Sequence, residues 1–199
     1  MEFELFQTLD TRYEIDKTED QGPVKCSNEK NAWLGFGYYF WEDEDLAHGW
    51  GHRHYNGVEY CVCKTTIQYS EKKCLDLVHV PAHKKKFREI CDVIKSENNF
   101  KKDDDILIAE VFDYLNKFNQ PWMKNFEALR VYGEKSFRNF TRQIKFDSVP
   151  PRDQARLTLN PEIQWCLLKK TSMNRTGFEV VYPDENDYIC IDKSRSGFH

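Results

Sequence analysis

The sequence lacks any apolar run long enough to cross a bilayer, and it carries no excess of positive charge. A membrane-spanning helix needs about 20 consecutive apolar residues, so we expect no membrane partner. The formal net charge of −4 excludes a generic binder of phosphate backbones, although a local basic face stays open. The segment Met1–Glu4 is acidic and lacks the apolar stretch of a signal peptide, so we expect a cytoplasmic protein.

Cysteine is present but odd in number, with seven residues scattered through apolar stretches, which is typical of reduced core thiols. Three histidines and two cysteines that follow one another closely are the residue types that bind zinc. They are His48, His52, His54, Cys61 and Cys63. Their spacing fits no familiar zinc site, and both cysteines can be core residues on one side of a strand. We therefore expect no metal.

Hydrophobic patterning predicts strands towards both ends of the chain and helices between them. Strands are expected over residues 3–9, 58–69, 74–80, 128–132, 143–146, 163–168 and 178–182, and helices over 42–50, 82–95 and 103–118. This order favours an α+β fold over a doubly wound parallel sheet. The absence of repeats and linkers predicts a single domain over residues 1–199, with a helical insertion at about 82–122.

The segment Gly35-Phe36-Gly37-Tyr38-Tyr39-Phe40 combines two glycines with a run of aromatic residues. Such glycines let the backbone approach a flat group closely or adopt a positive φ. Taken alone, the segment is typical of an aromatic core strand. A predicted helix with an acidic start follows this segment, and a predicted strand follows the helix. This succession favours a functional role for the segment over a core strand alone.

The stretch Leu34–Leu77 resembles the central part of ADP-ribosyltransferases of the diphtheria-toxin and poly(ADP-ribose) polymerase type. Their pattern there is Gly-x-Gly-aromatic-Tyr-Phe, then a short helix with an alanine near its middle, then a strand. The resemblance implies an α+β fold with split antiparallel sheets and flanking helices, and NAD⁺ as co-substrate. It implies that Tyr39 stacks on nicotinamide, whose positive charge the ring quadrupole attracts, within a cofactor-binding segment that includes Gly35, Gly37 and Tyr38.

The family also carries a His-Gly or Arg-Gly pair on its first strand, and Gln7-Thr8 is the nearest match here. The resemblance implies that this pair meets the nicotinamide amide and the ribose, and the Gln7 amide has donors for a hydroxyl. A surface glutamine on an edge strand is the alternative, and Arg12 is a rival candidate. His52 follows the nicotinamide segment closely, which suggests a contact with the pyrophosphate of NAD⁺.

The third family motif is a glutamate on a late strand, and Glu162 matches it at the start of an apolar run. The resemblance implies that this carboxylate holds the ribose 2′-hydroxyl and stabilises positive charge that develops at C1′. Glu162 and Tyr39 are therefore the catalytic candidates. Two alternatives stay open: Glu162 is a surface residue at a strand start, or Gln164 is the aligned residue and the catalytic carboxylate is missing.

The resemblance implies a mono-ADP-ribosyltransferase that transfers ADP-ribose from NAD⁺ to a macromolecular acceptor. Small free-standing members of the fold act as toxins in toxin–antitoxin or phage-defence systems, which implies an antitoxin protein as a partner. A catalytically inactive nucleotide-binding or protein-interaction module of the same fold is the first alternative. An unrelated α+β interaction protein is the second.

Basic and aromatic residues near the proposed strands favour a nucleic-acid acceptor, RNA or DNA, over a protein. They are Lys169, Lys170, Arg175, Arg138, Arg142, Lys145, Trp122, Phe126 and Tyr132. The run His83–Arg88 is either a solvated helix face or a further phosphate contact.

Overall fold

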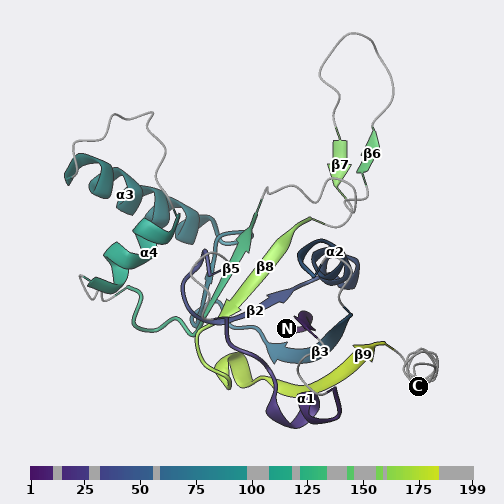
Figure 1. Ribbon diagram of the computed structural model, residues 1–199. Helices are drawn as coiled ribbons and strands as arrows, with labels where there is room; N and C mark the ends of the chain where they lie inside the picture. Colours follow the sequence, from purple (N-terminus) through teal and green to yellow (C-terminus); the bar gives the residue numbers. More distant parts are fainter. Residues whose placement is uncertain are drawn as a thin grey trace, which may run out of the picture.

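A twisted mixed sheet forms the centre of the protein, and helices pack against it (Figure 1). This computed structural model describes residues 1–10, 15–26, 32–55, 59–97, 108–117, 122–133, 143–145, 156–158 and 161–183. The elements are β1 (Glu2–Asp10), α1 (Ile15–Gln21), β2 (Tyr38–Trp41), α2 (Glu44–His54), β3 (Tyr60–Gln68), β4 (Cys74–Asp76), α3 (Pro81–Glu97), α4 (Ile108–Lys117), β5 (Ala128–Tyr132), β6 (Gln143–Lys145), β7 (Arg156–Thr158), β8 (Ile163–Leu167), the 3₁₀ helix η1 (Ser172–Asn174) and β9 (Thr176–Tyr182). The predicted α+β class is confirmed.

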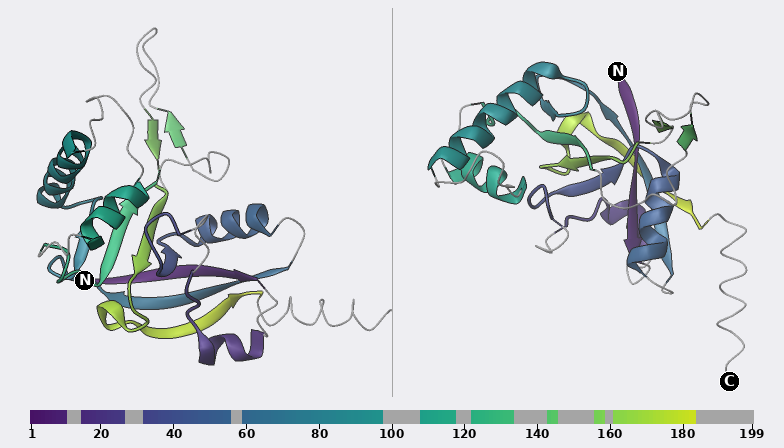
Figure 2. Two further views of the ribbon diagram at one scale, coloured as in Figure 1. Left: turned by 60° about the vertical axis from the view of Figure 1, so that its left-hand side comes forward. Right: turned by 90° about the horizontal axis from the view of Figure 1, so that it is seen from above.

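The sheet has seven strands in the order β4-β5-β8-β2-β1-β3-β9. Strands β4 and β5 pair in parallel, whereas the other neighbours are antiparallel. Where split antiparallel sheets were expected, the structure has this one mixed sheet and a separate hairpin of β6 and β7. Strands β5 and β8 cross the direction of β1, β3 and β9 in Figure 2, because the right-handed twist accumulates across the sheet.

The inner face of this curved sheet is filled by one apolar cluster, here called the inner core. It joins residues from most strands and from the segment around η1: Leu5, Leu9, Phe40, Cys61, Cys63, Ile67, Cys74, Ala128, Ile163, Trp165, Leu167, Met173 and Phe178. Cys61 and Cys63 lie in it, while Tyr60 and Val62 face the other way. The alternation predicted for this strand is thereby confirmed.

The outer face of the sheet carries two helical groups side by side. Helices α3 and α4, which connect β4 to β5 within the predicted insertion, bury Ile94 and Phe112 against Leu75 and Leu129 of the sheet. Helix α2 buries Leu46 and Ala47 against strands β1, β2 and β3. The two groups leave a strip of sheet between them, formed by β2 and β8.

Helix α2 begins where the sequence places a strong start signal. The side chain of Asp43 accepts a hydrogen bond from the main-chain N–H of Leu46 at 3.2 Å, and Glu44 and Asp45 occupy the first turn. An N-cap of this kind stabilises a helix by about 1 kcal/mol, and the acidic turn suits the helix dipole. In the described part of the chain, no helix is both long and apolar enough to cross a membrane.

Candidate functional site

The strip between the helical groups brings the aromatic segment beside the late strand. Tyr39 pairs with Cys166 and Trp41 pairs with Gln164 in the β2–β8 register, and paired residues of antiparallel strands point to the same face. We call these four residues the β2–β8 strip. Two of the three strands that carry the predicted motifs, β2 and β8, are thus direct neighbours, and the third, β1, pairs with β2 on its other side.

Tyr39 is held rigidly within the strip. Its hydroxyl accepts a hydrogen bond from the main-chain N–H of Leu34 at 2.7 Å and donates one to the carbonyl oxygen of Gly35 at 2.8 Å. Gly35 has a φ of 91°, in the left-handed region that glycine tolerates. Burial raises the pKa of Tyr39, so the phenol stays neutral and its ring is fixed in orientation.

Gly37 is needed for the close approach of β2 to β8. A Cβ atom at this position would lie 2.3 Å from Sγ of Cys166 and 2.8 Å from the carbonyl oxygen of Leu167. The sequence predicts a close backbone approach as one role of this glycine. The structure confirms that approach, and the group approached is strand β8 rather than a ligand. Burial raises the pKa of Cys166 to about 12, so its thiol stays protonated and is no nucleophile at neutral pH.

Gln164 is surrounded by tryptophans. Its Oε1 atom accepts a hydrogen bond from Nε1 of Trp33 at 2.6 Å, and it lies opposite Trp41. Trp50 of α2 packs near Trp41, with ring centroids 6.3 Å apart. Trp33 and Trp41 thus flank an amide whose nitrogen is a hydrogen-bond donor, which suits a flat, polar ligand. None of these tryptophans was predicted from the sequence as a site residue.

Glu162 precedes β8 and is 7% exposed. It lies at a turn in which the N–H of Ile163 donates to the carbonyl oxygen of Pro161 at 2.7 Å. Measured from Cys166, the partner of Tyr39, Gln164 lies about 7 Å along the strand, and Glu162 lies beyond the strand start. Gln164 is thus nearer to Tyr39 along the strand than Glu162 is, and it is on the same face.

Gln7 and Thr8 face opposite sides of the sheet. Phe6 pairs with Trp41, so Phe6 and Thr8 share the face of Tyr39, and Gln7 points to the inner face. The Gln7 amide is occupied there. Its Nε2 atom donates to the carbonyl oxygens of Val24 and Tyr39 at 2.9 and 3.1 Å, and its Oε1 atom accepts from Val24 N–H at 2.8 Å. The Thr8 hydroxyl donates to the carbonyl oxygen of Ala47 at 2.7 Å.

Two further predicted residues lie away from the strip. Tyr38 packs against the inner core, on the face opposite Tyr39. His52 is exposed on α2, with Nε2 3.2 Å from the hydroxyl of Tyr60 on β3, and β1 separates β3 from β2. A ligand bound on Tyr39 therefore has no direct contact with Tyr38, and Gln7 is likewise removed from its reach. Arg12, the rival of Gln7, lies outside the described residues.

The zinc-type residues are divided by the sheet. Cys61 and Cys63 are buried in the inner core, while His48 lies on the α2 side, with Nδ1 3.0 Å from the Tyr60 hydroxyl. Among the residues that the structure describes, no group of three histidine, cysteine or carboxylate side chains is placed to hold a metal ion.

A buried charged cluster, which sequence reasoning missed, lies on the inner face. Arg130 of β5 binds Glu42 through Nε and Nη2 and Asp76 through Nη1 at 3.0 Å. Trp165 Nε1 donates to Glu42 at 2.6 Å, and the Tyr69 hydroxyl donates to Asp76 at 3.1 Å. The cluster connects the end of β2 with strands β4, β5 and β8, so it fixes the strands that carry the strip.

The partners stabilise the charged forms of Asp76 and Arg130. Burial would raise the pKa of Asp76, but the main-chain N–H groups of His79 and Val78 together with Arg130 lower it below its usual value. Burial would lower the pKa of Arg130, but Glu42 and Asp76 raise it. With both carboxylates paired to the guanidinium, the cluster has a structural role.

The basic and aromatic candidates are only partly brought together. Lys169, Trp122 and Phe126 line two adjoining cavities near the end of β8. Tyr132 is exposed at the opposite end of β5, where it pairs with Ile163. Lys170 donates to the carbonyl oxygen of Gln21, and Arg175 Nε donates to that of Lys170. Arg138 and Arg142 lie outside the described residues. Lys145 falls in β6, and the run His83–Arg88 forms part of α3.

No protein-family model matches the chain, and comparisons with curated proteins and with solved structures find no match to it. What the chain does is therefore argued from the arrangement of its residues and from the resemblance of its aromatic segment. Neither of the two cavities is lined by Tyr39, Thr8 or Glu162, so a ligand on the strip would bind over the sheet and displace the covering Trp33 side chain or stack on it.

Proposed function

We propose that the protein is an NAD⁺-dependent mono-ADP-ribosyltransferase with an ADP-ribosyltransferase-like fold, and that the β2–β8 strip binds the nicotinamide half of NAD⁺. The observation that carries the proposal is the order β8-β2-β1 in the sheet centre. The three segments that resemble the family motifs lie side by side, with Tyr39, Thr8 and Gln164 on one face and Glu162 immediately before β8.

Tyr39 is suited to hold a cationic ring. Its hydroxyl is bonded to Leu34 and Gly35, so the ring pays little entropy to adopt the binding orientation. The negative face of an aromatic ring attracts a pyridinium by about 0.5–2 kcal/mol. That attraction ends when neutral nicotinamide forms, which favours its release.

In the transfer step, the bond between C1′ of the ribose and the nicotinamide nitrogen breaks, and its electron pair goes to nicotinamide. A nucleophile of the acceptor forms the new bond to C1′ and loses its proton to solvent. Positive charge develops on the ribose between these events, and a nearby carboxylate stabilises it. Glu162 is our candidate for this group, and the Gln164 amide would donate to a ribose hydroxyl.

A stand-alone transferase of this kind would modify macromolecules of its own cell or of an invading phage. We therefore propose a toxin of a toxin–antitoxin or phage-defence system that acts in the cytoplasm, with an antitoxin protein as partner. A nucleic-acid acceptor is favoured over a protein. If toxicity depends on the carboxylate, a gene that carries Glu162→Ala is tolerated where the intact gene is not.

A second candidate function is a catalytically inactive nucleotide-binding module. The observation that favours it is the register, which puts the amide of Gln164 rather than a carboxylate nearest to Tyr39. Such a protein would bind NAD⁺ through the same strip and leave its glycosidic bond intact.

The test is nicotinamide release from NAD⁺ by the purified protein, with and without total cellular RNA, DNA or protein. We expect release that depends on one added fraction and that is lost in Glu162→Gln. Glu179→Gln is the matched control, because Glu179 is an exposed carboxylate on β9. If nicotinamide release survives in Glu162→Gln but is lost in Gln164→Ala, the catalytic role would belong to Gln164 instead of Glu162. Binding without release in any fraction would establish the inactive module.

A further inference from the structure

A recessed surface separate from the β2–β8 strip lies at the end of β8. It consists of two adjoining cavities of about 520 and 380 Å³ that share Lys72, Asn125 and Phe126. We call it the basic groove, and its lining comprises Glu71, Lys72, Lys73, His83, Trp122, Lys124, Asn125, Phe126, Glu127, Leu168 and Lys169. The main-chain placement of these residues is set by the sheet.

Three strand ends converge to build the groove. The N–H groups of Glu127 and Ala128 donate to the carbonyl oxygen of Lys73 at 2.7 and 3.2 Å, which joins the start of β5 to the start of β4. The N–H of Leu168 donates to the carbonyl oxygen of Glu127 at 2.9 Å, which adds the end of β8. Lysines from segments far apart in sequence thus meet at one site.

The groove is basic although the chain as a whole is acidic. Lys73 is paired with Glu127, with Nζ 2.9 Å from Oε1. Lys72, Lys124 and Lys169 are exposed, and in the described part of the chain no carboxylate forms an ion pair with any of the three. Three lysines are therefore available for anionic groups of a ligand.

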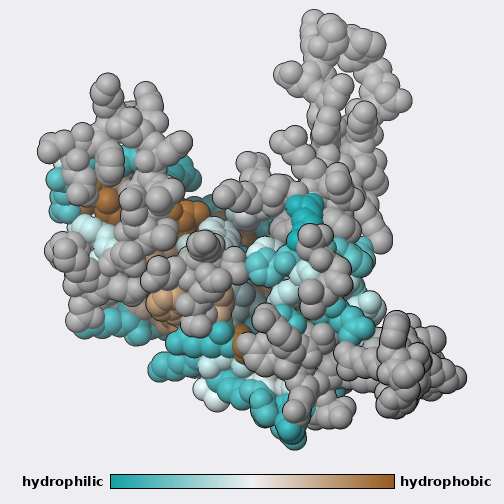
Figure 3. Space-filling model, viewed as in Figure 1, coloured by the Kyte–Doolittle hydropathy of each residue, from teal (hydrophilic) through white to brown (hydrophobic). Residues whose placement is uncertain are grey.

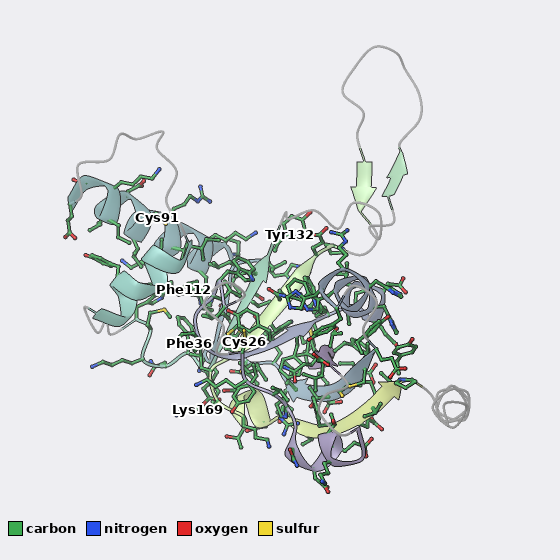
Figure 4. The ribbon with its side chains drawn as sticks, in the orientation of Figure 1. Cys26, Phe36, Cys91, Phe112, Tyr132 and Lys169 are labelled. Atoms are coloured by element: carbon green, nitrogen blue, oxygen red, sulfur yellow. The ribbon has the colours of Figure 1, made fainter. Side chains whose placement is uncertain are left out.

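The wall of the groove is aromatic. The half-buried rings of Trp122 and Phe126 meet edge to face with centroids 5.4 Å apart, and the ring of His83 lies 5.3 Å from that of Phe126. Figure 3 shows apolar side chains between the α3–α4 helices and the sheet. Figure 4 places Lys169 and the exposed ring of Phe36 towards the same end of the sheet.

We propose that the basic groove binds single-stranded nucleic acid. Lys72, Lys124 and Lys169 would neutralise successive phosphates, while unstacked bases lie against Phe126 and Trp122. The amide of Asn125 can hydrogen-bond to base edges. An acidic peptide would satisfy the lysines but make no use of the aromatic wall, and a duplex keeps its bases stacked away from it.

The groove and the β2–β8 strip are connected through one strand and one apolar cluster. Lys169 follows β8, five residues or about 16 Å along the chain from Gln164, and Trp122, Phe126 and Tyr39 pack against the same cluster as the α3–α4 helices. A strand held in the groove would thus pass close to the strip. That this strand is the ADP-ribose acceptor rests on the proposed function, whereas its binding does not.

The test is fluorescence anisotropy of short labelled oligouridine RNA and oligothymidine DNA, with a duplex and polyglutamate as further probes. We expect a single strand to bind more tightly than the duplex or polyglutamate, with affinity that falls as salt rises. Replacing Lys72, Lys124 and Lys169 together by alanine should reduce the slope of log K against log salt concentration by about 2. Each lysine that neutralises a phosphate of a single strand contributes about 0.7 to this slope. Phe126→Leu should weaken binding about tenfold or more. The RNA and DNA arms identify the preferred strand.

A matched control removes the same charge elsewhere: Lys17, Arg53 and Lys64, which are exposed or partly exposed on α1, α2 and β3, are replaced by alanine. This variant should bind like wild type, and urea unfolding midpoints should show that all variants are folded. No binding at low salt, equal loss in both triple variants, or tighter binding of polyglutamate would each overturn the proposal. Tyr39→Leu should bind RNA like wild type, because Tyr39 does not line the groove. A wild-type protein that binds RNA but releases no nicotinamide from NAD⁺ would count against the proposed function alone.

Discussion

The buried cluster around Arg130 predicts a large loss of stability from a single substitution, Arg130→Met. Methionine fills much of the space but leaves Glu42 and Asp76, which are 16% and 1% exposed, without their cation. Removing one partner of a buried ion pair costs about 3–5 kcal/mol. The free energy of unfolding of domains of this size is about 5–15 kcal/mol, so the variant should lose a large part of its stability.

The loss should depend on pH in a defined direction. The pKa of Asp76 in the folded protein is lowered from its ordinary value of 3.8, so its pairing stabilises the wild type above that value and is lost as the pH falls below it. In Arg130→Met the ionised carboxylates are instead unpaired. The difference in free energy of unfolding between wild type and Arg130→Met should therefore be largest at neutral pH and should shrink on acidification below about pH 4.

Urea unfolding followed by tryptophan fluorescence measures this difference, because Trp165 lies in the cluster. The matched control is Lys64→Met, which removes a partly exposed lysine from its ion pairs with Glu4 and Glu179 at 3.5 and 3.8 Å. Exposed pairs contribute about 0–1 kcal/mol. A loss in Arg130→Met no larger than in Lys64→Met would refute the reasoning.

Two further substitutions test the strip and helix α2. Gly37→Ala should lower the free energy of unfolding by about 1–3 kcal/mol, because the added Cβ meets Cys166 and the carbonyl oxygen of Leu167. Adding Cys166→Ala to this variant should restore only part of the lost stability. Unchanged stability of Gly37→Ala, measured by urea unfolding, would contradict the close approach of the two strands. Burial lowers the pKa of His48, although Glu44 raises it, so its neutral form stabilises the protein above about pH 6.5 and this contribution is lost as the pH falls. Wild type should therefore lose more stability between about pH 7.5 and 5.5 than His48→Gln, and equal losses in urea titrations would exclude the shift.

Most elements could be predicted from the sequence, because their side chains alternate or repeat clearly. Their pairing could not, since alternation identifies the faces of a strand and not its neighbours. The predicted strand over 74–80 is shorter in the structure, because the Asp76 side chain accepts hydrogen bonds from the N–H groups of Val78 and His79 at 2.7 Å and turns the chain. No local sequence pattern indicated that β4 and β5 pair in parallel.

The candidate site was predictable in part. Tyr39 and Gly37 were identified because glycine and aromatic residues form a local pattern. Gln7 and Thr8 were assigned together to one ligand, but adjacent residues of a strand face opposite ways, so only Thr8 shares the face of Tyr39. The bond from Trp33 to Gln164 joins residues 131 positions apart, and no local pattern reports such a contact.

The basic groove shows the same limit. Lys169, Trp122 and Phe126 were predicted as nucleic-acid contacts, whereas Lys72 and Lys124 were not. They belong to separate turns, and the hydrogen bonds of the β4, β5 and β8 ends bring them together. Sequence gives the residue types, and the register of the sheet decides which of them meet.

The central claim is that Tyr39 holds the nicotinamide ring of NAD⁺, and equilibrium binding measured by calorimetry tests it most directly. We expect NAD⁺ to bind more tightly than NADH, because the oxidised ring is cationic and the reduced ring is neutral. Tyr39→Phe keeps the ring but loses its hydrogen bonds to Leu34 and Gly35, so it should bind NAD⁺ more tightly than Tyr39→Leu although less tightly than wild type. Tyr39→Leu keeps only apolar volume and should weaken binding about tenfold, or about 1.4 kcal/mol. Tyr132→Ala, at an exposed tyrosine outside the strip, should bind like wild type. Equal affinity of the Leu and Phe variants for NAD⁺, or no NAD⁺ binding by folded wild type, would contradict the account.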